Sequence, residues 1–164
     1  AKPRIKKRYL TGAITVSDKM NVFQSIARAV SEHGVDTMFG LMGDANLFMV
    51  DSFVRDCGGR FVPAAHEGST ILMALAYAHV SGKVGVATVT HGPAVTNCAT
   101  ALTEAARSHI PLVVLAGDTP VDNPRHLQSI DQREFVKVTR PRIIEHQLQT
   151  VWTQFNPCGC RFLH

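Results

Sequence analysis

Residues 63–120 decide the fold of this chain, and they read PAAHEGSTILMALAYAHVSGKVGVATVTHGPAVTNCATALTEAARSHIPLVVLAGDTP. Two short apolar runs within this stretch are typical of strands that are buried on both faces of a sheet. Glycine or proline separates these runs from longer segments with helical character. The expected elements are a helix over 67–80, a strand over 84–90, a helix over 92–106 and a strand over 111–116. This alternation predicts an α/β fold with a parallel sheet and helices on both faces.

The residues that precede this stretch repeat the alternation. Apolar residues recur at helical spacing after Ser17 and Asp18, and Gly34 closes that helix. A strand over 35–39, a helix over 47–54 and a strand over 60–64 follow. Ligands of parallel sheets bind beyond the carboxyl ends of the strands. The polar and glycine-rich turns that we expect at this edge are 40–46, 64–68, 90–94 and a turn that begins at Gly117.

The two ends of the chain differ from this core. Residues 1–15 form a basic leader that we expect to be disordered; without five of its charges the net charge falls from +4 to −1. After residue 118 the alternation stops: 130–138 is compatible with a short helix or strand, and 143–152 with a helix. We therefore expect one domain over 16–150 and an irregular tail over 151–164.

The composition argues against several classes of function. The longest apolar run is too short to span a membrane, and no secretory signal is visible. No aromatic residues interleave with the basic leader, which argues against nucleic-acid binding. The four cysteines do not form a zinc-binding pattern and are expected to be free thiols in a reducing cytoplasm.

Glu67 is the leading candidate for a functional residue. It follows an expected strand, begins an expected helix, and is preceded by His66. A carboxylate at that position also stabilises a helix simply by complementing the helix dipole. Position alone therefore leaves both the structural and the functional interpretation open.

The sequence around Glu67 resembles that of a known family. Residues 63–120, together with GVDTMFGLMGDAN at 34–46, resemble the N-terminal pyrimidine-binding domain of thiamine-diphosphate enzymes, most closely those of the acetolactate synthase type. The resemblance extends from about residue 16 to about residue 148. It implies the three-layer αβα thiamine-diphosphate-binding fold, although the final helix and a GPV-like strand of that fold are expected to be missing.

The resemblance also implies roles for individual residues. Glu67 matches the glutamate that hydrogen-bonds the aminopyrimidine and so activates the cofactor, a form of acid–base catalysis. Pro93 and Asn97 match a segment near the pyrimidine, and Gly43 matches a proline-glycine turn there. The implied catalytic residue is Glu67, and the implied cofactor-binding residues are Gly43, Glu67, Pro93 and Asn97.

The chain also departs from the family pattern. Met42 replaces a proline and either packs or alters the turn, and Ala94 replaces a glycine whose absence is expected to crowd the backbone. Asp118 stands where the family often has glutamine. His91 stands where close relatives have a small residue, and both a proton-transfer role and a structural role remain open.

The metal-diphosphate half of such a site is missing from this sequence. The family binds magnesium and the diphosphate through a GDG segment and paired asparagines on a second domain, and neither occurs here. The resemblance therefore implies no metal ligand in this chain, and thiamine diphosphate with Mg²⁺ held through a partner domain. The chain alone is expected to be inactive.

Three functions remain open at this point. The first is the pyrimidine domain of an acetolactate synthase-like carboligase or decarboxylase, a transferase or lyase acting on 2-oxo acids such as pyruvate. The second is the small subunit of a split two-subunit 2-oxo acid decarboxylase, and the third is a non-catalytic interaction module with the same fold. Domains of this family associate through apolar surface, so we expect a homo-oligomer, most simply a dimer.

Overall fold

The computed structural model describes residues 20–120, 123, 125–139, 142–146 and 149–154. Its elements are α1 (Val22–Glu32), β1 (Thr37–Gly40), α2 (Leu47–Arg55), β2 (Arg60–Pro63), α3 (Glu67–Ser81), β3 (Gly85–Val89), α4 (Pro93–Thr96), α5 (Ala99–Ser108), β4 (Leu112–Ala116), α6 (Gln132–Lys137), β5 (Arg142–His146) and β6 (Gln149–Gln154). The expected helix start at Ser17 and Asp18 lies outside the described residues. The described helix begins after Asn21, which forms a capping box with Gln24.

The sheet has the strand order β2-β1-β3-β4-β6-β5. Strands β2, β1, β3 and β4 run parallel to one another, which confirms the predicted parallel sheet for this part. Strand β6 runs antiparallel to both β4 and β5. The expected helix over 143–152 is therefore wrong, because this segment forms a hairpin that pairs with the edge of β4. The expected domain boundary at residue 150 falls within β6, and the division itself stays a prediction.

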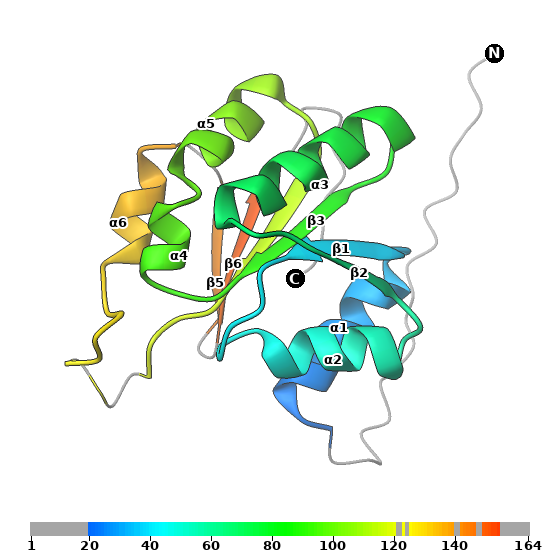
Figure 1. Cartoon of the computed structure of the whole chain (residues 1–164), viewed down its shortest axis with the longest axis horizontal. Helices are drawn as coiled ribbons and strands as arrows, with labels where there is room; N and C mark the ends of the chain where they lie inside the picture. Colours follow the sequence, from blue (N-terminus) through cyan, green and yellow to red (C-terminus); the bar gives the residue numbers. More distant parts are fainter. Residues whose placement is uncertain (1–19, 121–122, 124, 140–141, 147–148, 155–164) are drawn as a thin grey trace.

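Helices cover both faces of the sheet, as predicted (Figure 1). On one face, α1 and α2 pack their buried side chains against Met38, Val86 and Leu115 of the strands. On the other face, α3 and α5 pack against Val89 and Val114. Because side chains alternate between the two faces of a strand, every residue of β3 is buried. Among the described helices, none has both the length and the apolar character that crossing a bilayer requires.

Candidate functional site

The loops that follow the four parallel strands meet at the carboxyl edge of the sheet. These loops lie so close together that two positions have room only for glycine. A Cβ on Gly43, in the loop after β1, would lie 2.7 Å from Cβ of Thr90, which follows β3. A Cβ on Gly117, after β4, would lie 2.3 Å from Cβ of Ala45. The predicted edge is thus formed by segments that are far apart in the sequence.

Glu67 is the first residue of α3 and lies at this edge. Its Oε2 atom accepts a hydrogen bond of 2.9 Å from Nδ2 of Asn97, the residue that ends α4. The carboxylate is half-buried, and the N-terminus of α3 favours its negative charge. The structure therefore brings together two of the residues that were predicted to form the site.

The glycine after Glu67 allows α3 and α4 to approach each other. A Cβ on Gly68 would lie 3.2 Å from the backbone oxygen of Asn97, closer than most real contacts. His66 caps α3, because its Nδ1 accepts a hydrogen bond of 3.1 Å from the Gly68 amide. This assigns His66 a structural role at the helix start.

The other two predicted site residues occupy the same edge without touching the carboxylate. Pro93 is exposed and begins the short helix α4 that leads to Asn97. Gly43 lies against Thr90, and its amide donates to Oδ1 of Asn46 at 2.8 Å. The hydrogen bonds of the described residues join neither Pro93 nor Gly43 to Glu67, so cofactor contact by these two residues stays a prediction.

The two residues that depart from the family pattern, Met42 and Ala94, differ in how deeply they are buried. Met42 is half exposed, so its side chain is not part of the described core. Ala94 is 4% exposed and belongs to the core cluster between α3, α5 and the sheet. The methyl group of Ala94 therefore packs into the interior, and the expectation that it crowds the backbone approach to the cofactor stays a prediction.

Two buried amides that the sequence analysis did not single out hold this edge together. Asn46 is 3% exposed; it accepts from the Gly43 amide and donates to the Leu41 carbonyl and the Thr88 hydroxyl. Gln132 accepts from the Gly92 amide at 2.8 Å and donates to the Gly117 carbonyl at 3.0 Å. Asn46 lies in the quoted stretch 34–46, but its bond to Thr88, like both bonds of Gln132, joins residues far apart in the sequence and leaves no local signal.

Cys98 lies directly behind the carboxylate. Burial raises the pKa of its thiol to about 12, and the charge of Glu67 adds to this rise. The thiol therefore stays protonated, and its Sγ donates to the Ala94 carbonyl. Among the described residues, no three histidine, cysteine or acidic side chains are placed to hold a metal ion together.

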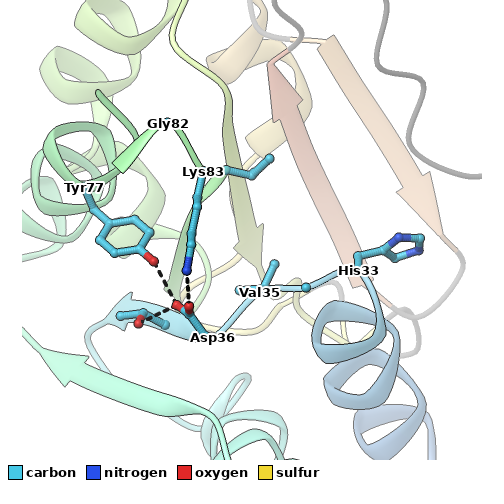
Figure 2. A pocket seen from close by; sticks show the side chains of 9 residues that line it. His33, Val35, Asp36, Tyr77, Gly82 and Lys83 are labelled. Atoms are coloured by element: carbon cyan, nitrogen blue, oxygen red, sulfur yellow. Dashed lines mark hydrogen bonds and ion pairs between the residues drawn. The ribbon is translucent and has the colours of Figure 1, made fainter. Parts of the chain in front are cut away.

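A pocket of about 240 Å³ lies at the opposite, amino edge of the sheet (Figure 2). It is lined by residues from 33–37, by Tyr77 and by 82–84. Asp36 accepts hydrogen bonds from Tyr77 and Thr37 and is paired with Lys83. The Lys83 ammonium, followed by the two hydroxyl groups, holds the pKa of the Asp36 carboxyl far below its usual range. These groups satisfy one another, so we place the functional site at the carboxyl edge.

Taken together, the fold and the site define a class of protein. This is an αβα domain whose carboxyl edge presents a half-buried carboxylate, held by an amide and located at a helix N-terminus. No described residue hydrogen-bonds to Oε1 of Glu67, so this oxygen keeps its accepting capacity for a ligand with N–H groups.

Comparison with known proteins defines the class further. Residues 20–135 match the family described as "Thiamine pyrophosphate enzyme, N-terminal TPP binding domain". The chain belongs to this family, which confirms the resemblance noted in the sequence.

Three similar proteins illustrate the range of the family. The chain is 36% identical to a sulfoacetaldehyde acetyltransferase of Rhodobacter capsulatus over 97 residues, 59% of this chain and 16% of that protein. It is 40% identical to an acetolactate synthase of Mycobacterium avium over 94 residues, 57% of this chain and 15% of that protein. It is 41% identical to a probable 2-ketoarginine decarboxylase of Pseudomonas aeruginosa over 93 residues, 57% of this chain and 16% of that protein. The matched region thus spans about a sixth of each relative.

Proposed function

We propose that this chain provides the pyrimidine-binding half of a thiamine-diphosphate site in an acetolactate synthase-like carboligase or decarboxylase that acts on 2-oxo acids. The observation that carries the proposal is the hydrogen bond between Glu67 and Asn97 at the carboxyl edge. The names of the relatives, an acetolactate synthase, an acetyltransferase and a probable decarboxylase, support this range of reactions.

The residues present fit an aminopyrimidine. Such a ring offers a nitrogen and an amino group, and a carboxylate oxygen complements either a protonated nitrogen or an N–H donor. Oε1 of Glu67 is available for this contact, while Asn97 holds Oε2 in place. When bound, thiamine diphosphate supplies a thiazolium carbon acid that adds to carbonyl groups. Glu67 holds or releases the proton at its own Oε1.

The remaining half of the site is assigned to a partner domain. The sequence contains no GDG segment with paired asparagines, so Mg²⁺ and the diphosphate are held elsewhere in this proposal. Exposed apolar side chains, including Phe48 at 62% and Val80 at 85%, provide surface for such a partner and for a second copy in a homo-oligomer. Cys57 and Cys98 are free thiols, which is consistent with a protein of the cytoplasm.

The proposal is tested with Glu67→Gln, which keeps the shape of the side chain but removes its ability to exchange a proton. The chain is mixed with a domain that carries the metal-diphosphate site, and cofactor affinity and carboligation from pyruvate are measured. We expect activity to fall by about 10²–10⁴-fold, the usual contribution of an acid–base group. Glu104→Gln on the exposed face of α5 is the matched control and leaves activity unchanged.

Unchanged activity in Glu67→Gln, with the wild-type circular dichroism spectrum, contradicts the assigned role. The mixing experiment also separates two kinds of partner. Activity that requires a separate polypeptide with the metal-diphosphate site supports the split two-subunit decarboxylase. Activity that requires the two domains in one polypeptide supports the acetolactate synthase-like arrangement.

A further inference from the structure

His91 is a buried side chain with an unsatisfied nitrogen at the carboxyl edge. It lies in the loop after β3, separated from the end of that strand by Thr90, and is 3% exposed. Its Nε2 is buried and has no hydrogen-bond partner among the described residues. Buried polar atoms almost always have a partner, so an exception at a ligand-binding edge indicates a function.

The contacts of the other ring nitrogen determine the tautomer of His91. The hydroxyl of Thr90 donates its single proton to Oδ1 of Asp44 at 2.8 Å. Oγ1 of Thr90 also accepts from the Ala45 amide at 3.4 Å, and it lies 3.2 Å from Nδ1 of His91. Because the hydroxyl proton is already used, Nδ1 must be the donor in this contact. In the neutral ring, Nε2 then carries a lone pair and no proton.

A carboxylate lies close to the ring of His91. Oδ1 of Asp44 lies 3.7 Å from Nδ1. The hydrogen bond from Thr90, followed by the proximity of His91, lowers the pKa of the Asp44 carboxyl, which therefore stays ionised. An adjacent carboxylate stabilises the imidazolium that forms when Nε2 takes up a proton. A base oriented by a third group is the usual arrangement for proton transfer in enzymes.

The second titratable group against His91 is His126, on the segment that covers this edge. The two ring centroids are 5.4 Å apart, and the rings are tilted by 56°. Nδ1 of His126 accepts from the Gln128 amide at 3.2 Å. The segment is pressed onto the start of α4, because a Cβ on Gly92 would lie 2.0 Å from the Gln128 carbonyl oxygen. His126 is thus the second titratable side chain that lies against the ring of His91.

We propose that His91 is a second acid–base residue of the site, and that its Nε2 accepts a proton from a hydroxyl or amino group of the bound ligand. The proposal rests on the proposed function. In the step, the ligand O–H or N–H bond breaks, its electron pair stays on the oxygen or nitrogen, and a new Nε2–H bond forms. The proton returns to the ligand or passes to water. Gly92 and α4, about 6 Å of helix, lie between His91 and Asn97, which holds Glu67.

The first test measures the tautomer of the His91 ring directly and does not depend on enzyme activity. Two-dimensional ¹⁵N–¹H spectra of the 164-residue chain are recorded at neutral pH, and His91→Gln identifies the signals of His91. We expect a protonated Nδ1 and a non-protonated Nε2. A protonated Nε2 in the neutral ring overturns the proposal, whatever the outcome of the cofactor experiments.

The second test uses the pH dependence of turnover in the reconstituted enzyme, with pyruvate and thiamine diphosphate as probes. We expect His91→Gln to lower kcat by about 100-fold or more and to remove the loss of activity on the acidic side, because glutamine cannot be protonated. His79→Gln, on the exposed surface of α3, is the matched control and retains the wild-type profile.

His126→Ala separates catalysis from packing at this site. If His126 only covers Nε2, this variant keeps the acidic limb of the profile and binds the cofactor. A His91→Gln enzyme with unchanged kcat and an unchanged acidic limb overturns the proposal. Failure of the wild-type chain to bind thiamine diphosphate counts against the proposed function instead, and the tautomer measurement then still decides the state of His91.

Discussion

Each of the two edges of the sheet has a carboxylate, but the two carboxylates differ in the number and charge of their hydrogen-bond partners. At the amino edge, Asp36 is surrounded by the Lys83 ammonium and by the hydroxyl groups of Tyr77 and Thr37 (Figure 2). At the carboxyl edge, Glu67 has one described partner, the neutral amide of Asn97. Donors of the protein largely satisfy the first carboxylate, whereas the second keeps an oxygen for a ligand.

The other polar groups at the two edges also differ in whether they have hydrogen-bond partners. The polar groups of the pocket at the amino edge join the segment before β1 to the segment before β3. The carboxyl edge has a buried imidazole nitrogen without a described partner. Unused hydrogen-bonding capacity is therefore our reason for placing the candidate site at the carboxyl edge and not at the pocket.

The largest expected effect on stability separates a crowded glycine from an open one. Gly92 and Gly82 both have positive φ, 61° and 69°, but a Cβ on Gly92 would overlap the Gln128 carbonyl, while Gly82 has nothing within 4 Å. We expect Gly92→Ala to lower the free energy of unfolding by about 3 kcal/mol or more, through strain and overlap together. Gly82→Ala should cost about 1 kcal/mol, the penalty of the left-handed conformation alone.

Urea unfolding of the two variants measures this difference. The slope of the free energy against urea should match that of the wild type in both, so that the shift in midpoint reports stability. Equal shifts would show that segment 126–128 does not press on Gly92 as described.

The fold was largely predictable because local signals agreed with the tertiary structure. Helix α3 begins at Glu67 and ends before Gly82, whose left-handed conformation is the one that its position in the sequence predicts. The buried run of β3 was visible as a continuous apolar segment. Because strand and helix order then determine the edge, the position of Glu67 at the carboxyl edge could be predicted, while its role stays a prediction.

The sequence-based predictions are wrong or incomplete where contacts between residues far apart in the sequence determine the structure. Residues 143–152 are apolar in a pattern that does not distinguish a helix from a strand, and pairing of β6 with β4 selects the strand. The roles of Asn46 and Gln132 depend on loops up to 42 residues away in sequence. The tautomer of His91 depends on which group receives the proton of Thr90, a detail that no sequence pattern contains.

A smaller effect is expected when one donor is removed from each carboxylate. Asn97→Ala removes the amide that holds Glu67, and a hydrogen bond to a charged group contributes roughly 1.5–3 kcal/mol. We expect at least about tenfold weaker binding of thiamine diphosphate or slower turnover in the reconstituted enzyme. Tyr77→Phe removes the 2.8 Å donor of Asp36 and should leave cofactor binding unchanged. An equal loss in both variants would mean that the effect comes from the fold as a whole.

The smallest effect is expected from Asp36→Asn, because the Asp36 and Lys83 side chains are half exposed and their attraction is screened by solvent. The pKa of Asp36 is lowered by folding, so its ionised form stabilises the folded state above the unfolded pKa, about 3.9. This contribution is lost as the pH falls toward the folded pKa. We therefore expect the difference in midpoint between wild type and Asp36→Asn to be small at pH 7, to shrink below about pH 4, and to shrink with added salt. A difference that grows in acid would show that Asp36 is not held in its ionised form, and the amino edge would then no longer be the satisfied counterpart of the carboxyl edge.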